Sequence, residues 1–282
     1  MNFDKPIVSD RFKGVIYAHL VLNLQPNPLS GTPLILAIHG HPGTGKSFQL
    51  REVLCEYGVE TQQLASSDFE DQFAGEPAKI IRRAYVDSGV NANGKPRALV
   101  VNDLDAAIGQ WGDLVQSTTN RQHVLGELLS ICDEPTGLDS DPTLRTPIFI
   151  TANDLTKLYQ PLVRTGRARF FYWEPSHAEL TRIVAGIYCD SLDLKEVAEL
   201  IDRVGSTRVS DYSDLLNSYA YAQLRQSAIA PEAKSDFDKV VAGALSFKLR
   251  VRFEDIIDYL EDWRAEREAI GDYSKWHSGG GV

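Results

Sequence analysis

Residues 39–48, HGHPGTGKSF, combine glycines, a lysine and a hydroxyl group at a spacing that suits phosphate binding. Gly40–Ser47 fit the pattern GxxxxGK[ST], in which glycines let backbone N–H groups turn toward phosphate oxygens. Lys46 can reach the β- and γ-phosphates, and the Ser47 hydroxyl can bind Mg²⁺. The pattern therefore predicts a nucleoside triphosphate site. The expected nucleotide-binding residues are Gly40, His41, Pro42, Gly43, Thr44, Gly45, Lys46, Ser47 and Phe48.

A second candidate stretch, LVVNDLDAA at residues 99–107, is an apolar run that ends in polar residues. An ATPase with this type of phosphate loop normally has an Asp and then a Glu here, which hold Mg²⁺ and polarise the attacking water. This chain has Asn102 and Asp103, with Asp105 two residues later. One interpretation is that Asn102 is a defect and that the protein only binds the nucleotide. The other is that Asp103 is the base or water positioner, that Asn102 holds a metal-bound water and that Asp105 adds charge. Together with Ser47, these three residues form the expected metal site.

Further polar residues follow two later apolar runs. Asn153, at the end of FITAND, is placed to hold the attacking water against the γ-phosphate; the alternative is an asparagine that caps a turn. Arg164 and Arg167 in LVRTGRARF have no obvious partner within the chain. They are either solvated surface charges or arginines that stabilise the transition state in a neighbouring subunit.

Hydrophobic patterning predicts the elements that hold these residues in place. Apolar runs indicate strands, and apolar residues at helical spacing indicate the helices between them. Such alternation is typical of an α/β fold, here a five-stranded parallel sheet with helices on both faces. The strands are expected at 33–40, 59–65, 97–103, 146–154 and 168–173, and the intervening helices at 46–57, 76–87 and 120–132, the last capped by Asn120.

The pattern changes to helices alone near residue 174, which predicts a small all-α lid after the α/β domain. We therefore expect an α/β domain at 1–174, a lid at 175–270 and a disordered glycine-rich tail at 271–282. The lid helices are expected at 179–188, 192–204 and 214–226, with a final helix through 253–263.

Composition narrows the class of protein. The chain has 282 residues and a net charge of −10, which argues against duplex nucleic acid as the partner. No run approaches the roughly 20 apolar residues of a membrane span, and the N-terminus lacks the apolar core of a secretory signal. Cys55, Cys132 and Cys189 form no CxxC pair, so a zinc site is not indicated. We expect a cytoplasmic protein.

Taken together, these motifs resemble an AAA+ ATPase module. More narrowly, GKSFQ, AGEPAKIIRRAY, VNDLDA, CDEPT, ITANDLTKLYQPLVRTGRARFFYWEP and FEDIIDYLEDW resemble the green-type Rubisco activases, over about residues 8–268. The resemblance implies a hydrolase that uses ATP and Mg²⁺, assembles into a hexameric ring and acts as a chaperone on a protein client. In this family the client is Rubisco, from which inhibitory sugar phosphates are released. Asp103, Asn153, Arg164 and Arg167 are the catalytic residues that we expect.

The chain also departs from the family pattern. Asn217 and Tyr219 stand where the family has the arginines of its second sensor. Phe73 stands where AAA+ remodellers place an aromatic residue that grips the client in the pore, although it could be a core residue. Trp111 would lie in a second pore loop within residues 107–120.

Two other functions fit the sequence less well. A DNA-linked AAA+ loader would need a basic patch, which the acidic balance disfavours. A nucleotide-binding scaffold with weak hydrolysis would explain Asn102, Asn217 and Tyr219 together.

Overall fold

The structure is a computed structural model that describes most of the chain. The described residues are 7–65, 68, 76–90, 95–105, 115–136, 145–155, 162, 166–188, 191–227, 233–241 and 251–277. The chain divides into two compact units, one of which holds Val8–Glu174 and the other Ile7 and the residues from Pro175 onward.

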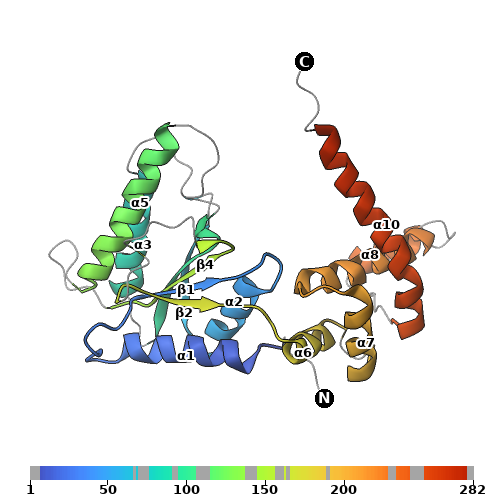
Figure 1. The fold of residues 1–282 in the computed structure, drawn as a ribbon, viewed down its shortest axis with the longest axis horizontal. Helices are drawn as coiled ribbons and strands as arrows, with labels where there is room; N and C mark the ends of the chain where they lie inside the picture. Colours follow the sequence, from blue (N-terminus) through green and yellow to red (C-terminus); the bar gives the residue numbers. More distant parts are fainter. Residues whose placement is uncertain are drawn as a thin grey trace. The chain divides into compact units, whose positions relative to one another are not determined.

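A five-stranded sheet forms the centre of the first unit (Figure 1). Its spatial order is β2-β3-β4-β1-β5, and every paired strand is parallel to its neighbour. The fold class expected from the sequence is confirmed. Because all strands run the same way, the residues that follow β1, β3 and β4 lie at one carboxyl edge of the sheet. The strands are β1 (Ile35–His39), β2 (Glu60–Leu64), β3 (Arg97–Val101), β4 (Ile148–Ala152) and β5 (Ala168–Tyr172).

Helices cover both faces of this sheet (Figure 1). On one face lie α1 (Asp10–Leu24) and α2 (Lys46–Glu56), which contact each other. On the other face α3 (Glu76–Val90) and α5 (Val115–Asp133) pack together and enclose the larger apolar core with the inward side chains of β3 and β4. The central strands are buried on both faces, which explains their continuous apolar sequences.

Helix α1 was not expected from the sequence. The Ser9 hydroxyl accepts a hydrogen bond from the Phe12 N–H and caps the helix. Phe12 and Ile16 are fully buried, and the Phe12 ring meets those of Phe171 and Trp173 edge-on, 5.6 and 5.0 Å between centroids. The helical spacing of these apolar residues was a usable signal. Residues 10–24 therefore belong to the core of the α/β unit.

The prediction that Asn120 caps the helix at 120–132 is wrong. Helix α5 begins at Val115, so Asn120 lies inside it. Polar residues cost a helix interior only a few tenths of a kcal/mol each, and packing against α3 compensates for that cost.

The second unit is all-helical within its described residues. It contains α6 (His177–Ile187), α7 (Leu194–Val204), α8 (Val209–Ser227), α9 (Ala233–Val241) and α10 (Phe253–His277). Its own apolar core includes Tyr188 next to α6, Leu200 in α7, Leu215 in α8 and Trp263 in α10, so four of these helices contribute to it. Helix α9 was not expected, and none of its residues is buried.

The structure differs from two predictions about the lid, the start of the disordered tail and the role of Tyr219. The tail was expected to be disordered from residue 271, but α10 continues to His277, because residues 271–277 contain one glycine and the glycine run begins only at 279. Residues 278–282 lie outside the described residues. Tyr219, expected at a sensor position, is buried in the lid core and meets the Tyr259 ring edge-on at 5.6 Å. Asn217 is exposed.

No helix within the described residues is both long enough and apolar enough to span a bilayer.

Candidate functional site

The phosphate loop between β1 and α2 has the backbone conformation that its glycines predict. Gly43 and Gly45 have φ angles of 78° and 84°, in the left-handed region. Gly40 has φ 150°, and a Cβ built on it would lie 2.1 Å from the carbonyl oxygen of Trp173. Only glycine fits at residue 40, because a side chain there would collide with the backbone that follows β5.

Trp173 fixes this loop to the end of β5. Its backbone N–H donates to the His39 carbonyl oxygen at 2.7 Å, and its indole Nε1–H donates to the Thr44 carbonyl oxygen at 2.9 Å. The side chain is fully buried, and the Arg11 guanidinium lies over its ring at 4.7 Å. This contact could not be predicted from the sequence, since a Trp at a strand end is usually a core residue.

Lys46 joins the phosphate loop to the end of β4. Its ammonium group donates to the carbonyl oxygens of Gly40 and His41, at 2.8 and 2.9 Å, and to Asn153 Oδ1 at 2.9 Å. Burial lowers the pKa of Lys46, while the charges of Asp103 and Asp105 raise it. The three hydrogen-bond partners are all neutral, so this ammonium group suits a phosphate.

A buried threonine that sequence reasoning missed connects three parts of the site. Thr151 Oγ1, in β4, lies 3.3 Å from Ser47 Oγ in α2 and accepts the Asp103 N–H at 3.0 Å. It also donates to Asn102 Oδ1 at 3.5 Å. A single hydroxyl group therefore holds Ser47 next to Asn102, two predicted metal-site residues, and next to Asp103, a predicted catalytic residue.

Asp103 is the second residue after β3 and has a strained conformation. Its φ is 49°, in the left-handed region that aspartate adopts only at a cost. Burial raises the pKa of Asp103, the negative charge of Asp105 raises it further, and Lys46 lowers it. A desolvated carboxylate held at a sharp turn is well suited to accept a proton or to orient a water.

Asp105 positions Asn153. Its Oδ2 accepts the backbone N–H groups of Asn153 and Asp154, both at 3.0 Å, and so ties the end of β3 to the end of β4. Its Oδ1 is buried without a hydrogen-bond partner among the described residues, which leaves one acceptor of the site unpaired. The sequence predicted only added negative charge here.

The donor set fits a magnesium nucleotide. Ser47, Asn102, Asp103 and Asp105 come together at the carboxyl edge, where the orphaned oxygen of Asp105 is also found. Within the described part of the chain, no cluster of three or more His, Cys, Asp or Glu side chains is placed to hold a metal without help. Phosphate oxygens and waters would therefore supply the remaining ligands.

Of the two arginines predicted to be catalytic, the described residues include only Arg167. Arg167 was expected to lack a partner in its own chain, but its Nε and one Nη donate to the two Asp133 carboxylate oxygens at 3.0 and 2.9 Å. This fork-to-carboxylate pair forms because α5 ends beside the start of β5. Arg164, Phe73 and Trp111 lie outside the described residues.

The sequence of this chain is similar to those of known ATPases and activases. The family model described as "ATPase family associated with various cellular activities (AAA)" matches residues 36–175, which hold all the described site residues. "Ribulose bisphosphate carboxylase/oxygenase activase" of Nostoc sp. is 35% identical over 227 residues, covering 77% of this chain. The chloroplastic activase of Cucumis sativus is 33% identical over 235 residues, covering 78%. The chain spans 55% of the first relative's length and 57% of the second's.

The close approach at Gly40 predicts that Gly40→Ala disrupts the phosphate loop. Its methyl group would press on the Trp173 backbone, where nothing flexible can yield, so we expect the thermal midpoint to fall and ADP affinity to drop at least about 10-fold. Calorimetric titration with Mg·ADP measures this. The matched control is Gly126→Ala in α5, where the methyl group meets open space and should be neutral or stabilising. Equal ADP affinity in both variants would contradict the assignment of Gly40 to the nucleotide-binding loop.

The position of Asp103 predicts that Asp103→Asn stabilises the nucleotide-free protein. Its folded-state pKa is raised above its ordinary value of 3.8, so the folded chain binds this proton more tightly than the unfolded chain. The carboxylate therefore costs stability progressively as the pH rises from 3.8 through the folded-state pKa.

Urea unfolding of Asp103→Asn measures this effect. The variant should gain more stability at pH 7 than at pH 4, whereas the easier left-handed backbone of Asn adds the same amount at both. Glu134→Gln, an exposed change of the same charge, controls for net charge. A gain that does not depend on pH would show that burial of the Asp103 charge costs nothing.

Proposed function

Because this chain belongs to the AAA ATPase family and is related to the Rubisco activases, we propose that it hydrolyses ATP and uses the energy to remodel a protein client. The observation that carries the proposal is the Lys46 ammonium group, held by neutral acceptors within a glycine loop at the carboxyl edge of the sheet.

Nucleotide binding follows from the loop and its helix. Backbone N–H groups at the start of α2 and the Lys46 ammonium group would contact the phosphates. Ser47 would bind Mg²⁺ directly, and Asn102, Asp103 and Asp105 would hold its waters. When bound, this ion neutralises charge on the phosphates.

Hydrolysis requires a positioned water. Asn153 lies where its amide can orient that water, and the two backbone N–H groups bound by Asp105 fix the strand end that carries it. As the water oxygen bonds to the γ-phosphorus and the bond to the leaving oxygen breaks, Asp103 takes up the water's proton. Its raised pKa makes it a better base than an ordinary aspartate.

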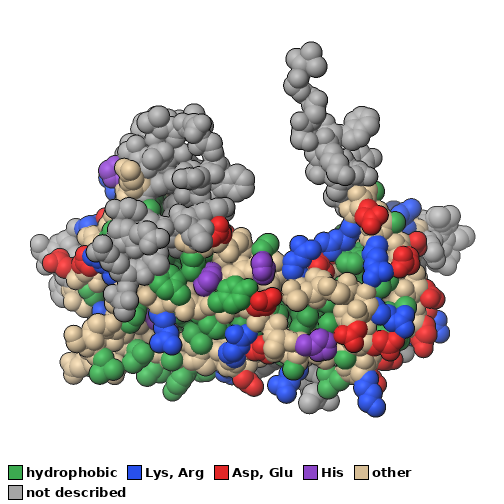
Figure 2. Space-filling model, viewed as in Figure 1, with side chains coloured by type: hydrophobic (Ala, Val, Ile, Leu, Met, Phe, Trp, Pro, Cys, Tyr) green, Lys and Arg blue, Asp and Glu red, His purple; other side chains and the backbone are tan. Residues whose placement is uncertain are grey.

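We propose Rubisco as the client and a homo-oligomeric, hexameric ring as the working state, with the chain acting as a chaperone. The names of the relatives support Rubisco, and the AAA family supports a ring. On the face of the lid unit seen in Figure 2, Lys and Arg side chains are interspersed with Asp and Glu, which favours a protein client over nucleic acid. The pore roles of Phe73 and Trp111 and the cytoplasmic location stay predictions.

Phosphate release from Mg·ATP tests the enzymatic proposal. The purified chain should release phosphate, and Lys46→Ala should abolish that release because the variant loses the group that contacts the β- and γ-phosphates. Lys79→Ala, an exposed lysine of α3, serves as the matched control and should keep full turnover. Equal and negligible turnover in the wild type and in Lys46→Ala would leave a nucleotide-binding scaffold.

Affinity capture tests the client. Asp103→Asn should bind Mg·ATP without hydrolysing it and so hold the client-bound state. We expect Rubisco large subunit to be captured with this variant in Mg·ATP, and not with Lys46→Ala. If the variant retains ATP but captures purified Rubisco no better than Lys46→Ala does, Rubisco is not the client.

Replacement of Arg167 tests whether the working state is a ring. If this arginine acts on the nucleotide of a neighbouring subunit, Arg167→Ala should lower the rate of hydrolysis by about 10³-fold or more. Arg169→Ala, an exposed arginine two residues later in β5, should change it little. Unchanged hydrolysis in Arg167→Ala would limit Arg167 to its pair with Asp133.

A further inference from the structure

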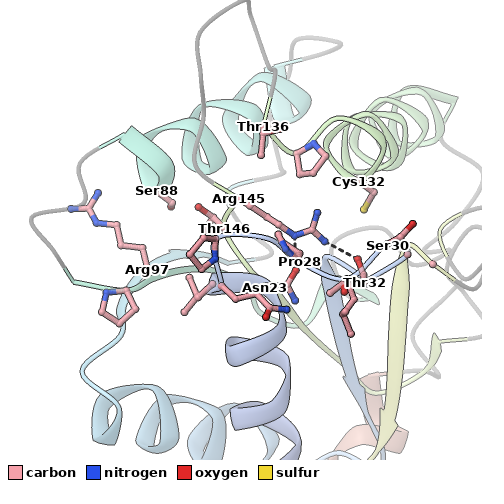
Figure 3. Close-up of a pocket in the computed structure, with 18 of the residues that line it drawn as sticks. Asn23, Pro28, Ser30, Thr32, Ser88, Arg97, Cys132, Thr136, Arg145 and Thr146 are labelled. Atoms are coloured by element: carbon pink, nitrogen blue, oxygen red, sulfur yellow. Dashed lines mark hydrogen bonds between the residues drawn. The ribbon is translucent and has the colours of Figure 1, made fainter.

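A cavity lies at the opposite edge of the sheet from the phosphate loop. Its volume is about 640 Å³, within the range of about 300–1,000 Å³ typical of small-molecule sites. It is bounded by the segment between α1 and β1, by the residues that lead into β3, β4 and β5, and by the end of α5. Figure 3 shows polar side chains from these segments around it, with Arg145 near its centre.

Arg145 is the unusual member of this cavity. Its Nε donates to Asn23 Oδ1 at 2.9 Å, and one Nη donates to the Thr32 carbonyl oxygen at 2.7 Å. Both acceptors are neutral, and no carboxylate of the described residues pairs with this guanidinium. Burial lowers the pKa of Arg145, as expected for a partly desolvated cation without an anionic partner. Such a cation is normally paired.

The other charged residues in the wall are already paired. Lys95 and Arg97 both contact Glu60, at 3.5 and 3.1 Å, and Asp133 forms its two-bond pair with Arg167. Because Lys95 and Arg97 share the one carboxylate of Glu60, these three side chains keep one surplus positive charge, and Arg145 adds a second. Ser30 and Thr136 add hydroxyl groups to the wall.

We propose that this cavity is a second ligand site, in which Arg145 binds the phosphate group of a small molecule. A phosphate dianion supplies the missing countercharge and accepts several hydrogen bonds from a guanidinium and nearby hydroxyl groups. The cavity exceeds the size of a free phosphate, which favours phosphate carried on a larger organic molecule. The site is separate from the nucleotide site and does not depend on ATP hydrolysis.

Equilibrium dialysis with radiolabelled inorganic phosphate tests the proposal on the full chain, with saturating Mg·ADP to occupy the phosphate loop. We expect one phosphate per ADP-loaded chain and at least about a 10-fold weaker Kd in Arg145→Gln. Arg97→Gln is the matched control, because Arg97 lines the same cavity but is paired with Glu60, and it should change the Kd by less than about 3-fold.

Arg145 also ties Asn23 and Thr32 together, so its replacement could disturb the fold. Ser30→Glu therefore provides a second variant, which places a carboxylate in the wall of the cavity while keeping Arg145. It should abolish phosphate binding without lowering the thermal midpoint, because the new charge can pair with the arginine. Competition by glycerol 3-phosphate distinguishes an organic phosphate ligand from inorganic phosphate. If glycerol 3-phosphate displaces the labelled phosphate at concentrations below the Kd of inorganic phosphate, the ligand is an organic phosphate. If higher concentrations are needed, the ligand is inorganic phosphate.

Three results would overturn the site. They are no phosphate bound to ADP-loaded wild type, an unchanged Kd in folded Arg145→Gln, and an unchanged Kd in Ser30→Glu.

Discussion

The arrangement of residues at the carboxyl edge of the sheet depends on one buried hydroxyl group, that of Thr151. It accepts the Asp103 N–H, donates toward Asn102 and lies beside Ser47, so that α2, the end of β3 and β4 share one contact. A hydroxyl provides one donor and two acceptor positions, and these neighbours match that capacity. Without it, the N–H of a strained residue would be left unpaired in a partly buried site. The conformation of Asp103 therefore rests on a neighbouring strand rather than on its own segment.

The phosphate loop is held in a comparable way by a residue far along the chain. Trp173 contacts the residues at both ends of the loop, His39 and Thr44, and its carbonyl oxygen occupies the space that a side chain at Gly40 would need. Helix α1 supports Trp173 through Phe12. The loop is thus preorganised by the core, which lowers the cost of ordering it around phosphates.

Much of this architecture could be predicted from the sequence. The five strands and the Lys46 loop carry strong local signals, because apolar runs and glycine spacing are set within a few residues. No local signal predicts the roles of Thr151 and Trp173, or the hydrogen bonds that Asp105 accepts from the end of β4. These roles arise from strands that become neighbours only in the folded sheet. The same reason explains Arg167, since Asp133 lies 34 residues earlier and meets it only after folding. Helix α1 was missed despite a usable pattern of buried residues.

We propose that Thr151 sets the geometry for hydrolysis, whereas the glycine loop and Lys46 bind the nucleotide. Single-turnover hydrolysis of pre-bound Mg·ATP by Thr151→Val tests it most directly, because valine keeps the shape and removes the hydroxyl. We predict ATP affinity within about 3-fold of the wild type and a hydrolysis rate lowered at least about 10-fold, which corresponds to about 1.4 kcal/mol of lost transition-state stabilisation. A folded variant with an unchanged hydrolysis rate would show that the Thr151 hydroxyl group does not set this geometry.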